Sequence, residues 1–61
     1  MTKTELRKIA QQALEREYGF APSINKIVLL EANREGTYIL FCVKNKEYCF
    51  YKRTIEKREE V

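Results

Sequence analysis

The sequence contains no histidine, no aspartate and no tryptophan, and Ser23 is its only serine. Most general acid–base catalysis and nucleophilic triads use histidine or aspartate. Two cysteines without a histidine can complete a zinc site only with a glutamate or with a second chain. We therefore predict that the protein is not an enzyme, and we expect no catalytic residue, no metal-binding residue, no cofactor and no small-molecule substrate.

Glycine and proline are also scarce, since Gly19 and Gly36 stand alone and Pro22 is the only proline. A phosphate-binding loop needs several glycines at a fixed spacing, so none is predicted. No apolar run approaches the roughly 20 residues that a membrane helix requires. The polar residues 1–5 lead straight into a helix pattern and do not resemble a secretory signal. We expect a soluble, cytoplasmic protein that does not contact a membrane.

The chain is short for a protein that must build a core. Its 61 residues predict a single small domain, 1–61. One core of this size seldom supplies more than about 3–5 kcal/mol, so such domains often depend on a disulfide, a metal or a partner. The four tyrosines, three phenylalanines and 44% apolar content predict a folded chain rather than a disordered one.

The N-terminal part has the pattern of an amphipathic helix over residues 2–18. Thr2 and Glu5 fit a capping box at its start. Gly19 is suited to end the helix in the left-handed conformation, and Ala21–Pro22 favours an extended exit. Apolar residues recur along one side at helical spacing. This stripe consists of Leu6, Ile9, Ala10, Ala13, Leu14 and Tyr18.

The middle of the chain predicts three consecutive strands, over residues 24–32, 37–44 and 47–53. With the helix they predict an α+β fold, in which an N-terminal helix packs on a three-stranded antiparallel meander. The tail, residues 54–61, has few apolar side chains to bury. We therefore expect it to be frayed or to form a short helix.

Asn33 and Gly36 fit a type I turn with a bulge between the first two strands. We expect Asn33 to pair with Thr37, which sets the register of the first hairpin. The pairs that follow are Val28 with Cys42 and Leu30 with Leu40.

The second turn, predicted at Asn45–Lys46, is less well specified, because glycine usually follows asparagine in a two-residue hairpin loop. A shift of one residue would exchange the two faces of the third strand. The predicted register sets Cys42 opposite Cys49, within disulfide range. In a reducing cell we expect two thiols that pack as small apolar groups. The other predicted pairs are Lys44 with Glu47, Leu40 with Tyr51 and Phe41 with Phe50.

Both faces of this sheet are apolar at the centre, whereas a sheet with one solvated face normally alternates apolar and polar residues. One helix can cover only one face, and we assign it to the face that carries Ile27, Leu29, Ile39, Phe41, Val43, Tyr48 and Phe50. The other face has an apolar centre and a charged margin, which is typical of a protein interface. The predicted interface residues are Val28, Leu30, Leu40, Cys42, Cys49 and Tyr51.

We predict from this a small interaction protein, either a homodimer through the open sheet face or a binder of another protein. A monomer with a bare apolar patch is less favoured. The alternative is a nucleic-acid-binding accessory protein, because the net charge of +3 permits such contact. A helix followed by three strands also resembles the first four elements of a double-stranded-RNA-binding domain, which implies a closing helix. The basic residues of this alternative are Lys44, Lys46, Lys52 and Arg53.

Overall fold

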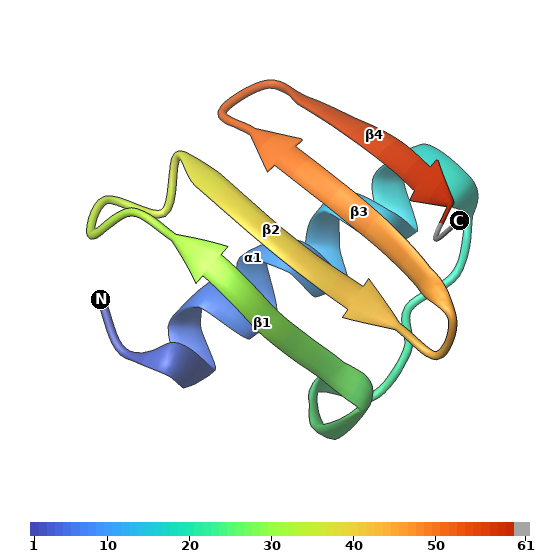
Figure 1. The fold of residues 1–61 in the computed structure, drawn as a ribbon, viewed down its shortest axis with the longest axis horizontal. Helices are drawn as coiled ribbons and strands as arrows, with labels where there is room; N and C mark the ends of the chain where they lie inside the picture. Colours follow the sequence, from blue (N-terminus) through green and yellow to red (C-terminus); the bar gives the residue numbers. More distant parts are fainter. Residues whose placement is uncertain (60–61) are drawn as a thin grey trace.

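The computed structural model describes residues 1–59, and within these it contains one α-helix and one antiparallel sheet in the order β1-β2-β3-β4 (Figure 1). The predicted α+β class is confirmed, but the prediction of three strands is wrong, because four are present. The elements are α1 (Lys3–Tyr18), the 3-10 turn η1 (Ile24–Lys26), β1 (Ile27–Ala32), β2 (Tyr38–Val43), β3 (Lys46–Tyr51) and β4 (Thr54–Glu59).

Helix α1 has the capping interactions that its sequence predicts. The Thr2 hydroxyl accepts a hydrogen bond from the Glu5 amide at 3.1 Å, and the Glu5 carboxylate accepts one from the Thr2 amide at 2.9 Å. The backbone hydrogen bond from Thr2 is the main reason that the pKa of Glu5 is lowered. At the other end Gly19 has a φ of 78° and donates to the Glu15 carbonyl at 3.0 Å. Local interactions therefore set both ends of the helix.

Thr2→Ala should lower the free energy of unfolding by about 1 kcal/mol, because the Glu5 amide loses its acceptor. Urea denaturation followed by circular dichroism measures this change. Thr4→Ala, in the same exposed first turn, is the control and should change stability little. Because the pKa of Glu5 is lowered from its ordinary value of 4.5, the ionised carboxylate stabilises the wild type at pH values above 4.5. This contribution to the free energy of unfolding is lost as the pH falls through the lowered pKa of the folded protein. An unchanged urea midpoint for Thr2→Ala would contradict the capping role.

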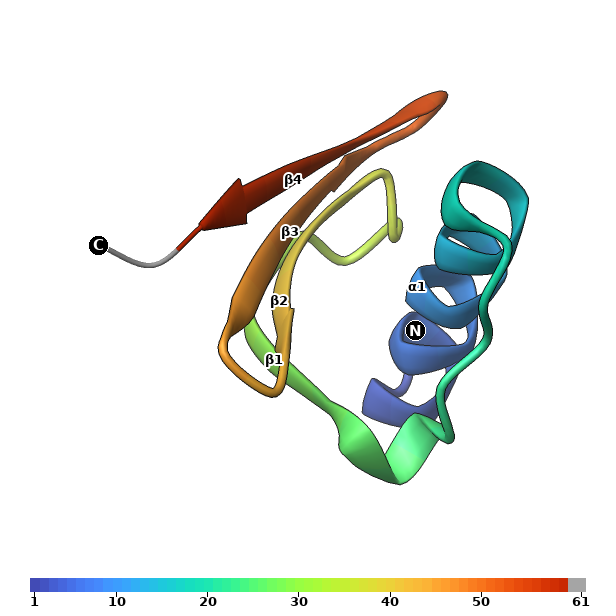
Figure 2. The same ribbon diagram turned by 90° about the vertical axis from the view of Figure 1, so that its right-hand side faces the viewer.

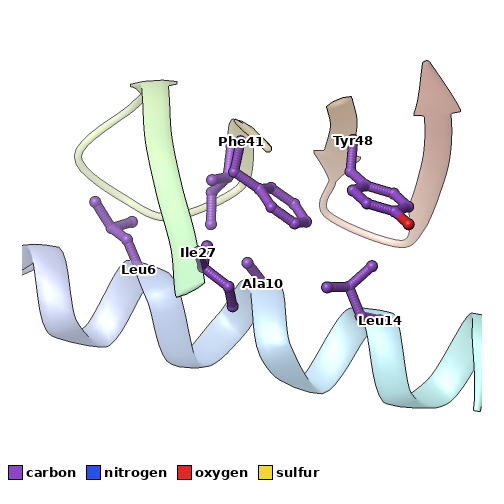
Figure 3. Close-up of a cluster of buried hydrophobic side chains, with 7 residues drawn as sticks. Leu6, Ala10, Leu14, Ile27, Phe41 and Tyr48 are labelled. Atoms are coloured by element: carbon purple, nitrogen blue, oxygen red, sulfur yellow. The ribbon is translucent and has the colours of Figure 1, made fainter. Parts of the chain in front are cut away.

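The core lies between α1 and the face of the sheet to which we assigned the helix (Figure 2). Figure 3 shows Phe41 and Tyr48 pointing from the sheet toward Ala10 and Leu14 on the helix. The rings of Phe41 and Tyr48 stack with centroids 5.4 Å apart. The buried cluster is Leu6, Ala10, Leu14, Ile27, Ile39, Phe41 and Tyr48.

The first strand begins three residues later than predicted. Residues Ile24–Lys26 form the 3-10 turn η1, so β1 starts at Ile27. From there β1 runs beside β2 and sets Val28 opposite Cys42, which confirms that predicted pair.

A bulge within β1 changes the second predicted pair. The register shifts between Leu29 and Glu31, so Glu31 rather than Leu30 lies opposite Leu40. Leu30 is the extra residue, and both Leu30 and Glu31 are exposed. Beyond the bulge Ala32 packs against the core. The bulge thus places the small side chain of Ala32, rather than that of its neighbour Glu31, on the helix side of the sheet.

The first turn forms where it was predicted, but it closes one residue later. The Asn33 side-chain oxygen accepts from the amides of Thr37 (2.9 Å) and Tyr38 (3.2 Å), and the Asn33 amide donates to the Tyr38 carbonyl. The predicted pairing of Asn33 with Thr37 is therefore wrong. Gly36 has a φ of 74°, and a Cβ there would lie 2.7 Å from the Met1 sulfur. The positive φ is what requires glycine here, because the Met1 side chain is flexible and can move away from a Cβ.

The second hairpin turns at Lys44–Asn45, one residue earlier than predicted. All of its predicted pairs are wrong, because every partner on β3 shifts by two residues. A shift of two preserves the faces, so Tyr48 and Phe50 still lie on the helix side. Cys42 and Cys49 are free thiols and diagonal neighbours, about 7–8 Å apart in such a pair, which exceeds the disulfide range. The observed pairs are Tyr38 with Tyr51, Ile39 with Phe50, Leu40 with Cys49, Phe41 with Tyr48, Cys42 with Glu47 and Val43 with Lys46.

Over residues 54–59 the predicted frayed or helical tail is instead strand β4, and residues 60–61 of that prediction lie outside the described residues. The chain turns at Lys52–Arg53, and β4 then pairs with β3 along its whole length. Ile55 lies opposite Phe50 and packs against the core. Backbone pairing with the edge of β3 orders a segment that has little to bury. Because a strand follows β3 in the described chain, the resemblance to a double-stranded-RNA-binding domain does not extend to a closing helix.

Candidate functional site

The face of the sheet opposite α1 is not covered by any element of residues 1–59 (Figure 2). We call it the open face. Its side chains form three rows that cross the strands, as the pairing shows. From β1 to β4 the rows are Val28–Cys42–Glu47–Arg58, then Glu31–Leu40–Cys49–Glu56, then Tyr38–Tyr51–Thr54 from β2 onward, and Leu30 projects at the bulge.

The six predicted interface residues all belong to this face, but they are not equally accessible. Val28, Leu30 and Tyr51 are exposed by 53%, 48% and 49%. Leu40 and Cys42 are half-buried. Cys49 is only 1% exposed and lies between Leu40 and Glu56 in the middle row. The accessible apolar surface is therefore centred on β1 and β2 and ends at Tyr51.

Two tyrosines form one end of the open face. The rings of Tyr38 and Tyr51 lie 5.4 Å apart. Burial, followed by a hydrogen bond with Glu31, raises the pKa of Tyr38. A hydrogen bond with the Cys49 side chain is the main cause of the raised pKa of Tyr51. Both phenols therefore stay neutral at physiological pH and offer hydroxyl groups beside the apolar surface.

A charged margin was predicted for the open face, and the fourth strand extends it. Strand β4 adds Glu56, which ends the middle row, and Arg58, which lies opposite Glu47. Glu31 contributes a third carboxylate at the β1 side. Three carboxylates and one guanidinium make the border acidic.

The structure does not bring together the four basic residues of the nucleic-acid alternative. Lys44 and Lys46 flank the β2–β3 turn, whereas Lys52 and Arg53 form the β3–β4 turn. These turns lie at opposite ends of the six-residue strand β3, about 20 Å apart at 3.3 Å per residue. The four residues therefore do not form one patch.

Residues 1–59 contain no group of three or more potential metal ligands. None of the helical segments described is long and apolar enough to cross a membrane. No protein-family model, curated protein or solved structure matches this chain. Its candidate sites are therefore interpreted from their own residues.

Proposed function

We propose that the protein is a small, non-enzymatic, cytoplasmic interaction protein that forms a homodimer through the open face. The main support is the exposure of Val28, Leu30 and Tyr51 on the side of the sheet without a helix. Monomeric proteins rarely expose a large contiguous apolar patch. A two-fold dimer covers such a patch without a second kind of partner, because the same surface of each copy packs against the other.

The edges of the sheet are less suited to self-association than its face. At the β1 edge the Arg7 side chain donates to the Ile27 carbonyl at 3.2 Å, and the bulge at Leu30 interrupts the regular edge. The β4 edge carries Lys57 and Arg58. Bulges and charged residues of this kind disfavour strand addition at an edge. We therefore expect the sheets to pack face to face, about 10 Å apart.

The acidic border predicts how the dimer responds to salt. Two copies that meet through this face bring carboxylates of like charge close together, which opposes association. Added salt screens this repulsion, so the dimer should become tighter as the salt concentration rises.

Leu40→Lys should convert the dimer to a monomer, because it places a charge at the apolar centre without a partner. Light scattering from low micromolar to millimolar concentration measures the mass, and the melting temperature of the wild type should fall on dilution. Leu30→Lys tests the same surface at an already exposed site, so its fold should be preserved. Gln12→Lys, on the exposed side of α1, is the control and should remain dimeric.

A wild-type protein that stays monomeric at millimolar concentration would rule out the homodimer. Loss of the dimer in Gln12→Lys as well as in Leu30→Lys would show that added charge, rather than the open face, controls association. The remaining interpretation of the open face would then be a different protein partner.

A further inference from the structure

A second surface lies on the helix side of the molecule, at the end of the sheet that contains the β2–β3 turn. It is an open groove of about 590 Å³, within the range of 300–1,000 Å³ typical of ligand sites. Phe20, Pro22, Val43 and Tyr48 form its apolar walls. The Gln11 side-chain amide donates to the Pro22 carbonyl at 2.8 Å and fixes one wall against α1. The helix therefore holds one wall of the groove in place.

Three lysines line the same groove: Lys26 from η1, Lys44 from the turn and Lys46 from β3. We base the inference on Lys26 and Lys44. Among the described residues, neither a carboxylate nor an arginine lines the groove. Lysine binds phosphate as a point charge, and no carboxylate of the described lining would repel a phosphate group. The lining therefore suits a ligand that carries phosphate groups.

Lys44 has an unusual backbone conformation for its residue type. Its φ is 58°, and it is the only non-glycine residue with a positive φ in the described chain. The first central residue of such a two-residue hairpin turn is normally glycine or asparagine. A lysine at this position costs stability, and strained residues of this kind cluster at functional sites. The strain thus supports a role for the Lys44 side chain at the groove.

Exposed aromatic rings adjoin the lysines. Tyr18 and Phe20 are exposed by 42% and 39%, and their ring centroids lie 6.3 Å apart. Tyr18 also contacts Tyr48, with centroids at 5.6 Å. Aromatic side chains beside a positively charged groove form the platform on which proteins stack unpaired bases. The acidic border of the open face is separate, since it lies on the other side of the sheet.

We propose that this groove binds single-stranded nucleic acid, with a base against the exposed ring of Phe20 and phosphates beside Lys26 and Lys44. Backbone charge and stacking are shared by all sequences, so binding should tolerate any base sequence. The assignment keeps Lys44 from the sequence-based set, adds Lys26, and leaves out Lys52 and Arg53. It is independent of dimer formation, because the groove and the open face do not share residues.

The test is fluorescence anisotropy of the full chain with a labelled oligothymidylate about 12 nucleotides long. We expect saturable binding that weakens with salt, with a log–log slope of about −0.7 for each phosphate contacted. Lys26→Gln combined with Lys44→Gln should weaken binding at least about tenfold and reduce the slope by about 1.4. Lys52→Gln combined with Arg53→Gln removes the same charge at the far end of β3 and should change affinity by less than about twofold.

Two single variants separate charge, stacking and folding. Lys44→Gly should raise the melting temperature, because it relieves the positive φ, and should still weaken binding. Phe20→Leu keeps the groove apolar but removes the ring, and should weaken binding about five- to tenfold. Leu30→Lys should keep full binding per protomer, even as a monomer.

Absence of saturable binding at low salt would overturn the proposal. An equal loss in both double variants would also overturn it, because binding would then follow net charge and not the groove. The protein could instead bind a peptide rich in glutamate and phenylalanine more tightly than the oligonucleotide. That result would overturn the proposal and assign the groove to an acidic protein segment.

Discussion

Phe41→Ala should lower the free energy of unfolding by about 3–5 kcal/mol, as is usual for a buried aromatic residue. Phe41 is fully buried and is the largest side chain in that state among those described. It lies between α1 and the sheet and stacks on Tyr48, so its removal leaves a cavity that several elements share. A domain of this size holds only about 3–5 kcal/mol in its core. The variant should therefore be largely unfolded at 25 °C.

Urea denaturation followed by far-ultraviolet circular dichroism measures this loss. Phe50→Ala is the matched control, because Phe50 lies on the same face but is only half-buried. We expect a clearly smaller loss for Phe50→Ala. If Phe41→Ala melted within a few degrees of the wild type, the packing of the helix on this face would be wrong.

Truncation of the chain after Arg53 should lower the free energy of unfolding by about 2 kcal/mol or more, because β4 is lost. The truncation removes Ile55 from the core and leaves the whole of β3 without its outer partner. The exposed edge of β3 should also promote association between chains. Urea denaturation and size-exclusion chromatography measure the two effects. A frayed or helical tail predicts no change in either.

Two neighbouring point variants test the same strand in the full-length chain. Ile55→Lys places a charge on the side that packs against the core, whereas Glu56→Lys changes a charge on the open face. We expect Ile55→Lys to destabilise the fold, and Glu56→Lys to stay within about 0.5 kcal/mol of the wild type. Equal effects would show that β4 does not alternate between the two faces.

The helix could be predicted almost residue by residue, because short-range interactions define it. Thr2 and Glu5 satisfy each other's amides, and Gly19 ends the helix within the same stretch of chain. The first turn was predicted for the same reason, since the Asn33 side chain bonds to residues only four and five positions away. Each of these features is complete within a few residues.

The strand pairings were harder to predict because turn chemistry alone does not fix them. The second turn forms one residue earlier than Asn45 suggested, although Lys44 then adopts a positive φ that its residue type disfavours. The bulge at Leu30 sets Ala32 rather than Glu31 against the core, a difference that the predicted regular pairing did not anticipate. Pairing over many residues outweighs these local preferences.

The candidate site was predicted in part. Alternation along the strands assigned Val28, Leu40 and Tyr51 to one face. The observed register differs from the predicted one by two residues, and a shift of two leaves each side chain on the same face. Part of the charged border depends on β4, whose single apolar residue, Ile55, gave no reason to expect an ordered strand. The groove joins Phe20 to Lys44 across more than twenty residues, a proximity that no local pattern encodes.

Periodicity and short-range hydrogen bonds define the helix with its caps, the α+β class and the apolar side chains that share a face, so these features could be predicted from the residues alone. The register of the hairpins, the fourth strand and the separation of acidic from basic surfaces became visible only in the folded chain, because strand pairing is a long-range property. Strand β4 is a polar segment that is ordered by backbone hydrogen bonds to the edge of β3. These hydrogen bonds could not be predicted from the side chains of the segment.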